Sequence, residues 1–156
     1  MDIKNMLARA AVASLLAAPL AAGAQDTVRE VGVGVIAGDP IGGTAKLWLS
    51  DRTAIDLGIG YSGNTVMWGD FLVHAWDLLP QPSEGRFGVY AGAGPRLETA
   101  PDAEFGLRTI IGLTWRLKRE PVELFAEAGP LFRFTPTGAV GADGGIGLRL
   151  YLGGAR

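Results

Sequence analysis

The most constraining feature of this sequence is the alternation of side-chain character along the segment FGLRTIIGLTWRL, which runs from Phe105 to Leu117. Its odd-numbered positions are almost all apolar, whereas its even-numbered positions include two glycines and two arginines. Successive side chains of a β-strand point to opposite faces, so a period of two predicts a strand with one apolar face. The fold then depends on which of the two faces meets the interior of the protein.

The same alternation recurs along the chain between clusters of Gly, Pro, Asp, Asn and Ser, which are typical of turns. No stretch of ten or more residues after residue 24 has the apolar period of 3.6 that an amphipathic helix requires. The pattern therefore predicts an all-β chain with eight strands, at Glu30–Ala37, Thr44–Ser50, Thr53–Tyr61, Thr65–Asp77, Arg86–Arg96, Glu104–Leu117, Val122–Arg133 and Ala142–Leu152.

Glycine content indicates how these strands are oriented. From Gln25 onward, glycine accounts for 23 of 132 residues, and most strand glycines share a face with the charged residues. If that face met water, the surface would be built largely from a residue that weakens strands and contributes no packing. If it faced the inside of a small barrel, glycine would instead leave room for a few long charged side chains.

The second arrangement predicts an eight-stranded antiparallel up-and-down transmembrane β-barrel with its apolar face toward lipid. Closure into a barrel is required because an open strand edge in hydrocarbon leaves backbone groups unpaired, each at a cost of several kcal/mol. The alternative is a soluble periplasmic barrel of the lipocalin type that binds an apolar ligand, which would require the two faces to be reversed.

The first 24 residues have the features of a cleaved secretory signal. Lys4 and Arg9 form a positive region, an apolar run follows from Ala10 to Leu20, and Ala22-Gly23-Ala24 is an A-x-A cleavage site. The apolar run is about half of the roughly 20 residues that a membrane-spanning helix needs. We therefore predict a signal peptide at residues 1–24 and one barrel domain at residues 25–156, located in the outer membrane.

Charge and cysteine content exclude several function classes. From Gln25 onward, 12 Lys and Arg stand against 15 Asp and Glu, which is not the basic balance expected for nucleic-acid binding. The chain has no cysteine, so it can form neither a disulfide framework nor a lipidated N-terminal cysteine. With one histidine and no cysteine, no metal site is expected, and we predict no cofactor.

The small or charged face collects ionisable residues of both signs. Charges removed from water are costly unless they are paired, so a balanced set is what a closed lumen requires. We predict a plug of crossed salt bridges in the lumen, with a proton or ion path as the competing interpretation. Its members are Lys46, Asp56, Asp70, His74, Arg108, Glu123, Glu127 and Arg149, with Arg116 on the same face.

His74 raises the question of catalysis, because membrane-barrel hydrolases combine a histidine with a serine nucleophile. The serines after the signal are Ser50, Ser62 and Ser83, and all three fall in predicted turns rather than beside His74 on its face. A hydrogen-bonding role within the polar lumen therefore accounts better for His74, and we predict no enzymatic activity and no catalytic residue.

Several runs of residues resemble a poorly characterised family of small bacterial outer-membrane barrel proteins. In chain order, these runs are GDPIGGTAKLWLSDRTAIDLGIGY, DFLVHAWDLLP, VYAGAGPRLE, ELFAEAGPLFRFTPTG and DGGIGLRLYL. The resemblance implies an eight-stranded barrel like the membrane domain of OmpA or OmpX, without an established enzymatic activity. The family's charged positions match Asp56, Asp70, His74, Arg108, Glu127 and Arg149, all on the predicted inward face, whereas Arg133 stands where the family tends to have an acidic residue.

This interpretation predicts a structural or surface-interaction role and a set of partners. These are outer-membrane lipid and lipopolysaccharide, together with the outer-membrane insertion machinery and periplasmic chaperones during assembly. We expect a monomer. The alternatives are the soluble ligand-binding barrel and a lipid-modifying barrel enzyme, which would depend on His74.

Overall fold

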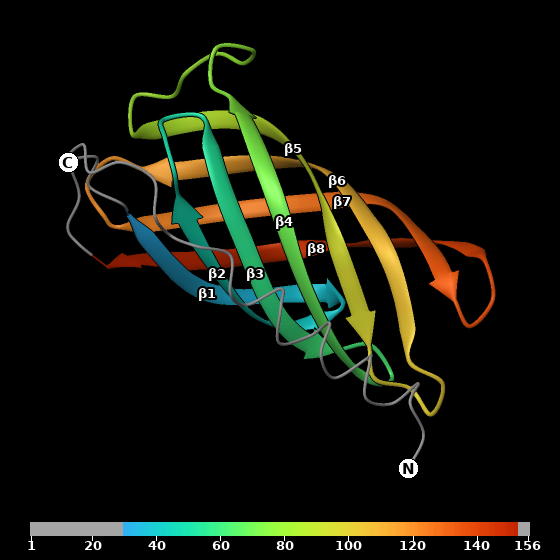
Figure 1. Ribbon diagram of the computed structural model, residues 1–156. Helices are drawn as coiled ribbons and strands as arrows, with labels where there is room; N and C mark the ends of the chain where they lie inside the picture. Colours follow the sequence, from blue (N-terminus) through green and yellow to red (C-terminus); the bar gives the residue numbers. More distant parts are fainter. Residues whose placement is uncertain (1–29, 153–156) are drawn as a thin grey trace.

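A computed structural model describes residues 30–152 as a closed barrel of eight antiparallel strands (Figure 1). The strands follow one another around the barrel in chain order, and β8 closes the barrel by pairing with β1. This confirms the predicted all-β, eight-stranded antiparallel barrel. The strands are β1 (Val31–Asp39), β2 (Ile41–Trp48), β3 (Thr53–Tyr61), β4 (Thr65–Ala75), β5 (Gly85–Glu98), β6 (Glu104–Leu117), β7 (Val122–Thr135) and β8 (Ala139–Leu152).

The predicted signal peptide lies outside the described residues. Within the described part of the chain, no helix is long and apolar enough to cross a membrane.

Strand bounds agree with the sequence pattern where side chains alternate clearly and differ where glycine hides the alternation. β3 and β6 begin and end at the predicted residues. β2 begins at Ile41, whereas the predicted start was Thr44. The prediction missed the first residues because only Pro40 separates β2 from β1, and because Gly42 and Gly43 have no side chain that would show the alternation. For the same reason β8 begins at Ala139, three residues before the predicted start.

The two faces of the sheet differ as the alternation predicts. Large apolar side chains such as Val35, Ile59 and Ile111 are exposed on the outside, and charged side chains are buried on the inside. The interior also holds six aromatic side chains that were not predicted to lie there, namely Trp48, Trp68, Trp76, Tyr90, Phe125 and Tyr151. Phe125 lies on the inward parity of β7, and its ring is buried inside the barrel.

Two glycines allow neighbouring strands to approach closely in the middle of the wall. A Cβ atom at Gly94 on β5 would lie 1.7 Å from the carbonyl oxygen of Gly69 on β4. A Cβ atom at Gly129 on β7 would lie 1.9 Å from the carbonyl oxygen of Thr109 on β6. Both glycines precede a proline in an Ala-Gly-Pro run. The same three-residue sequence therefore allows β5 and β7 each to approach the preceding strand closely.

The two ends of the barrel have different connections. At one end, which we call the hairpin end, the connections are Pro40 and residues 62–64, 99–103 and 136–138. At the other, which we call the terminal end, they are residues 49–52, 76–84 and 118–121, next to the start of β1 and the end of β8. The longest of these connections, residues 76–84, therefore lies at the terminal end.

Gln81, in that longest connection, takes the place of a missing strand. β5 pairs with β6 from Gly85 onward but with β4 only from Val89 onward, so residues 85–88 lack a neighbour on the β4 side. The Gln81 carboxamide fills part of this gap. Its Nε2 donates to the carbonyl oxygen of Phe87 at 2.8 Å, and its Oε1 accepts from the Phe87 amide at 3.0 Å. These are the two bonds that a facing strand residue would make.

We expect Gln81→Ala to destabilise the barrel by about 1 kcal/mol, since hydrogen bonds at a hydrated rim contribute modestly. The local effect is larger, because the Phe87 amide loses its acceptor and exchanges faster with solvent. Amide exchange at Phe87, together with urea unfolding, measures both effects. Ser83→Ala, in the same exposed connection, is the control and is expected to leave Phe87 unchanged. Equal Phe87 exchange rates in the two variants would contradict the capping role.

Candidate functional site in the barrel lumen

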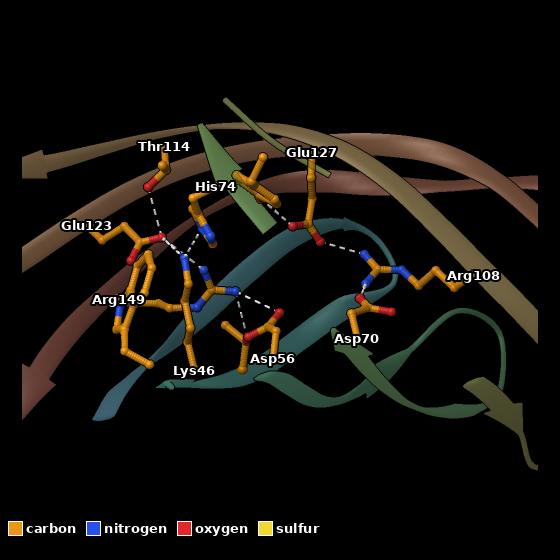
Figure 2. A network of polar contacts seen from close by, with 12 residues as sticks. Lys46, Asp56, Asp70, His74, Arg108, Thr114, Glu123, Glu127 and Arg149 are labelled. Atoms are coloured by element: carbon orange, nitrogen blue, oxygen red, sulfur yellow. Dashed lines mark hydrogen bonds and ion pairs between the residues drawn. The ribbon is translucent and has the colours of Figure 1, made fainter. Parts of the chain in front are cut away.

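The eight residues predicted for the lumen all lie inside the barrel, and none of them is more than 6% exposed. They come from β2, β3, β4, β6, β7 and β8, because each occupies an inward position of its strand's alternation. Figure 2 shows their side chains pointing toward one another across the lumen. They form two groups, one centred on Glu123 and the other on Arg108.

In the first group, Glu123 on β7 accepts hydrogen bonds from four side chains. Its Oε1 accepts from Lys46 Nζ at 2.8 Å, from Thr114 Oγ1 at 2.9 Å and from Arg149 Nη1 at 3.3 Å. Its Oε2 accepts from the hydroxyl of Tyr151. This carboxylate therefore joins β2, β6 and β8 to β7.

Arg149 extends the first group to the opposite side of the barrel. Its Nη2 donates to Asp56 Oδ2 at 2.9 Å and to Thr44 Oγ1 at 3.0 Å, and the Thr44 hydroxyl donates to Asp56 Oδ1 at 2.8 Å. The guanidinium carbon lies 3.7 Å from the centroid of the Phe125 ring. A planar cation that contacts two carboxylates and an aromatic face is well compensated for its loss of water.

The second group surrounds Arg108 on β6. Its Nη2 donates to Glu127 Oε1 at 2.5 Å, its Nε donates to Asp143 Oδ2 at 3.1 Å, and its Nη1 donates to Asp70 Oδ2. The Tyr90 hydroxyl donates to Glu127 Oε2 at 2.5 Å. Arg108 thus contacts Glu127 on the adjacent strand β7, and it also engages carboxylates from β4 and β8.

Three further charged residues belong to this group and were absent from the predicted set. Arg96 Nε lies 3.3 Å from Asp143 Oδ2, and Arg96 Nη1 donates to Glu98 Oε2 at 2.9 Å. Asn64 Nδ2 donates to Glu98 Oε1 at 3.0 Å, which carries the network to the hairpin end. The signal that could have found them is parity, because Arg96, Glu98 and Asp143 continue the inward alternation of β5 and β8.

His74 connects the first group to the aromatic side chains of the interior. Its Nε2 lies 2.9 Å from Lys46 Nζ, and because an ammonium group can only donate, Nε2 accepts this bond. The imidazole is packed among three aromatic rings, at centroid distances of 4.4 Å to Trp48, 5.1 Å to Tyr90 and 5.6 Å to Trp76. These contacts position His74 as a hydrogen-bonding and packing residue.

The serines considered as partners of His74 are placed elsewhere. Ser50 Oγ is within 2.7 Å of Thr53 Oγ1 in the connection of residues 49–52. The Ser62 hydroxyl donates to Asp39 at the hairpin end. Ser83 lies in the exposed connection of residues 76–84.

Arg116 shares the inward parity but lies outside both groups. Its side chain is 29% exposed at the terminal end, where Nη2 donates to Glu30 Oε2 at 2.7 Å. Its guanidinium lies over the rings of Tyr151 and Trp48, at 4.5 and 5.6 Å from their centroids. The Trp48 indole also donates a hydrogen bond to the Tyr151 hydroxyl at 2.9 Å. Near this end, therefore, aromatic side chains fill the lumen in place of the charge network.

Arg133, which departs from the pattern of the resembling family, has a partner of its own. Its Nε lies 3.2 Å from Glu104 Oε2 near the hairpin end. Within residues 30–152, no group of three or more His, Cys, Asp or Glu side chains is arranged to hold a metal ion.

Comparisons with protein-family models, with curated proteins and with solved structures found no match for this chain.

Proposed function

We propose that this chain spans the bacterial outer membrane as a small barrel with a structural or surface-interaction role, and that its lumen is closed. The observation that carries the proposal is the distribution of charge over the strands. Every charged strand residue occupies an inward position except Asp39, the last residue of β1. The outward positions between the strand ends are apolar or small and are extensively exposed, as expected for a surface that meets hydrocarbon.

The height of this apolar surface supports the same proposal. On β6, ten residue steps separate outward-facing Phe105 from outward-facing Trp115. At about 3.3 Å per residue this is about 33 Å along the strand, and a tilt of about 40° reduces it to about 25 Å. Transmembrane barrels have an apolar band of about 25 Å between two aromatic girdles. Phe87 pairs with Trp115 at one boundary, and Phe134 packs near Phe105 at the other.

The proposal includes the partners and the family likeness expected from the sequence. Lipid and lipopolysaccharide would surround the barrel, and the insertion machinery and periplasmic chaperones would assemble it as a monomer. The role is non-enzymatic, since the polar side chains of the lumen bond to one another. The resemblance to the membrane domain of OmpA or OmpX forms part of this proposal.

Cell fractionation tests the location. We expect the protein in the outer-membrane fraction, resistant to extraction by salt, and we expect unboiled and boiled samples to migrate differently on a denaturing gel. An outer-membrane porin and an abundant soluble periplasmic protein serve as markers for the two fractions. Recovery of the protein with the soluble marker would overturn the proposed location.

A planar bilayer tests whether the lumen is closed. An interior of eight strands is only wide enough to be filled by side chains, and here charged groups and aromatic rings occupy it. We expect the purified protein to produce no stable conducting state, whereas a 16-stranded porin in the same bilayer conducts. Regular openings in most insertions would contradict the closed lumen but would leave the membrane location intact.

A further inference from the structure

At the hairpin end, one side of β8 has no neighbouring strand. The pairing of β8 with β1 ends at Gly144 and Asp39, whereas the pairing of β8 with β7 continues to Ala139 and Arg133. Residues 139–143 of β8 therefore have a neighbour on the β7 side only. The β7–β8 hairpin extends past the β1–β2 turn in Figure 1.

The backbone groups that face the open side can be identified from strand alternation. The Tyr151 amide donates to the carbonyl oxygen of Pro121, on the β7 side. Along a paired strand, the N–H and C=O groups of successive residues alternate between the two sides, and the β7–β8 register is continuous without a bulge. Even-numbered residues of β8 therefore face away from β7. The amides and carbonyls of Val140 and Ala142 point to the side on which β1 has already ended.

The features that usually protect an exposed strand edge from pairing with another strand are absent from this part of β8. The comparable overhang of β5 is covered by the Gln81 carboxamide, but no hydrogen bond is formed to the backbone of Val140 or Ala142 within the described residues. Residues 139–142 include no proline and no charged side chain. The Val140 side chain is 72% exposed. An unprotected edge of this kind is a template for the addition of another strand.

We propose that this edge of β8 binds an extended peptide segment of a partner protein by strand addition. The segment would have small or β-branched neutral side chains beside Val140 and Ala142, with its backbone paired to theirs. A basic residue would flank it. Asp39, which pairs with Gly144 where the open edge begins, is exposed, and Arg133, the half-buried cation at the hairpin end, is already paired with Glu104.

A second copy of this chain fits the edge less well. Antiparallel pairing of two identical edges about Gly141 requires a two-fold axis perpendicular to the sheet, which would point the two barrels in opposite directions. Two copies inserted in the same direction into one membrane cannot adopt that arrangement. This step, unlike the existence of the edge, rests on the proposed membrane location.

Amide exchange on the full barrel refolded in detergent micelles tests the proposal. The probe is a blocked peptide of two lysines followed by alternating valine and threonine. We expect the amides of Val140 and Ala142 to exchange at least about tenfold more slowly at saturating peptide, while Gly141 stays protected throughout by β7. A peptide with N-methylated backbone nitrogens is expected to have no effect, and one with two glutamates in place of the lysines is expected to bind more weakly.

Two variants at Ala142 separate the effect of losing the backbone N–H from the effect of changing the side chain. Ala142→Pro removes an N–H that faces the open side and no N–H that faces β7, so the barrel is expected to fold and peptide protection of Val140 to be lost. Ala142→Val keeps the N–H and is expected to bind the peptide. Heat-dependent gel mobility confirms folding for each variant.

Three outcomes would overturn the proposal. The peptide could leave both exchange rates unchanged, or both amides could already be protected in the peptide-free monomer. Sedimentation could instead show a dimer that Ala142→Pro abolishes, which would assign the edge to a second copy. None of these results depends on cell fractionation, so a failure here is distinguishable from a failure of the proposed location.

Discussion

Replacing Arg108 with methionine is expected to lower the free energy of unfolding by about 3–5 kcal/mol, because the change leaves buried carboxylates without their cation. Arg108 is fully buried and contacts Asp70, Glu127 and Asp143, which come from three different strands. Methionine preserves much of the side-chain volume, so the main loss is charge and hydrogen bonding rather than packing. Urea titration of the refolded protein, followed by tryptophan fluorescence, measures the change.

Arg52→Met is the matched control for this variant. Arg52 forms an ion pair with Asp77 at 2.9 Å, but the two side chains are 62% and 78% exposed. Exposed pairs of this kind contribute about 0–1 kcal/mol, so the control variant is expected to unfold nearly like the parent. Similar small losses for Arg52→Met and Arg108→Met would show that the lumen is hydrated and that its charges act independently.

The inward residues could be predicted because assigning a residue to one face of a strand requires only a regular alternation of side chains. Alternation along clear segments such as β6 placed Arg108 inside, and alternation along the next strand, β7, placed Glu127 inside as well. A one-residue error in register would have turned every side chain of the strand to the other face. Fold class and lumen charges were therefore predicted by the same signal.

Other features needed information that parity does not contain. Parity places Asp143 on the inward face of β8, but it does not show which inward charges meet across the lumen. The three contacts of Arg108 span β4, β7 and β8, and which strands approach across the lumen depends on closure of the barrel. The inward aromatic rings, such as Tyr90, fill space left by glycines on neighbouring strands. That complementarity appears only when the strands are in register.

A charge on the outside of the barrel provides the most direct test of what surrounds it. Ile111 lies midway along β6, between Ala91 and Ala128 on the neighbouring strands, and is 68% exposed. In hydrocarbon, Ile111→Arg is expected to cost about 2–4 kcal/mol near the middle of the bilayer. In water, the same change at an exposed position would fall within about 0.5 kcal/mol of zero. Urea titration of protein refolded into lipid vesicles measures the difference.

Leu78→Arg is the matched control, because Leu78 has the same exposed fraction but lies in the connection of residues 76–84 at the terminal end. If lipid surrounds the strands and water surrounds their ends, Ile111→Arg destabilises the barrel and Leu78→Arg does not. Equal and small effects at the two positions would mean that water meets the whole outer surface, and the proposed membrane location would then be wrong. Equal and large effects would place the connection of residues 76–84 within the hydrocarbon, which would contradict the proposed boundary at Phe87 and Trp115.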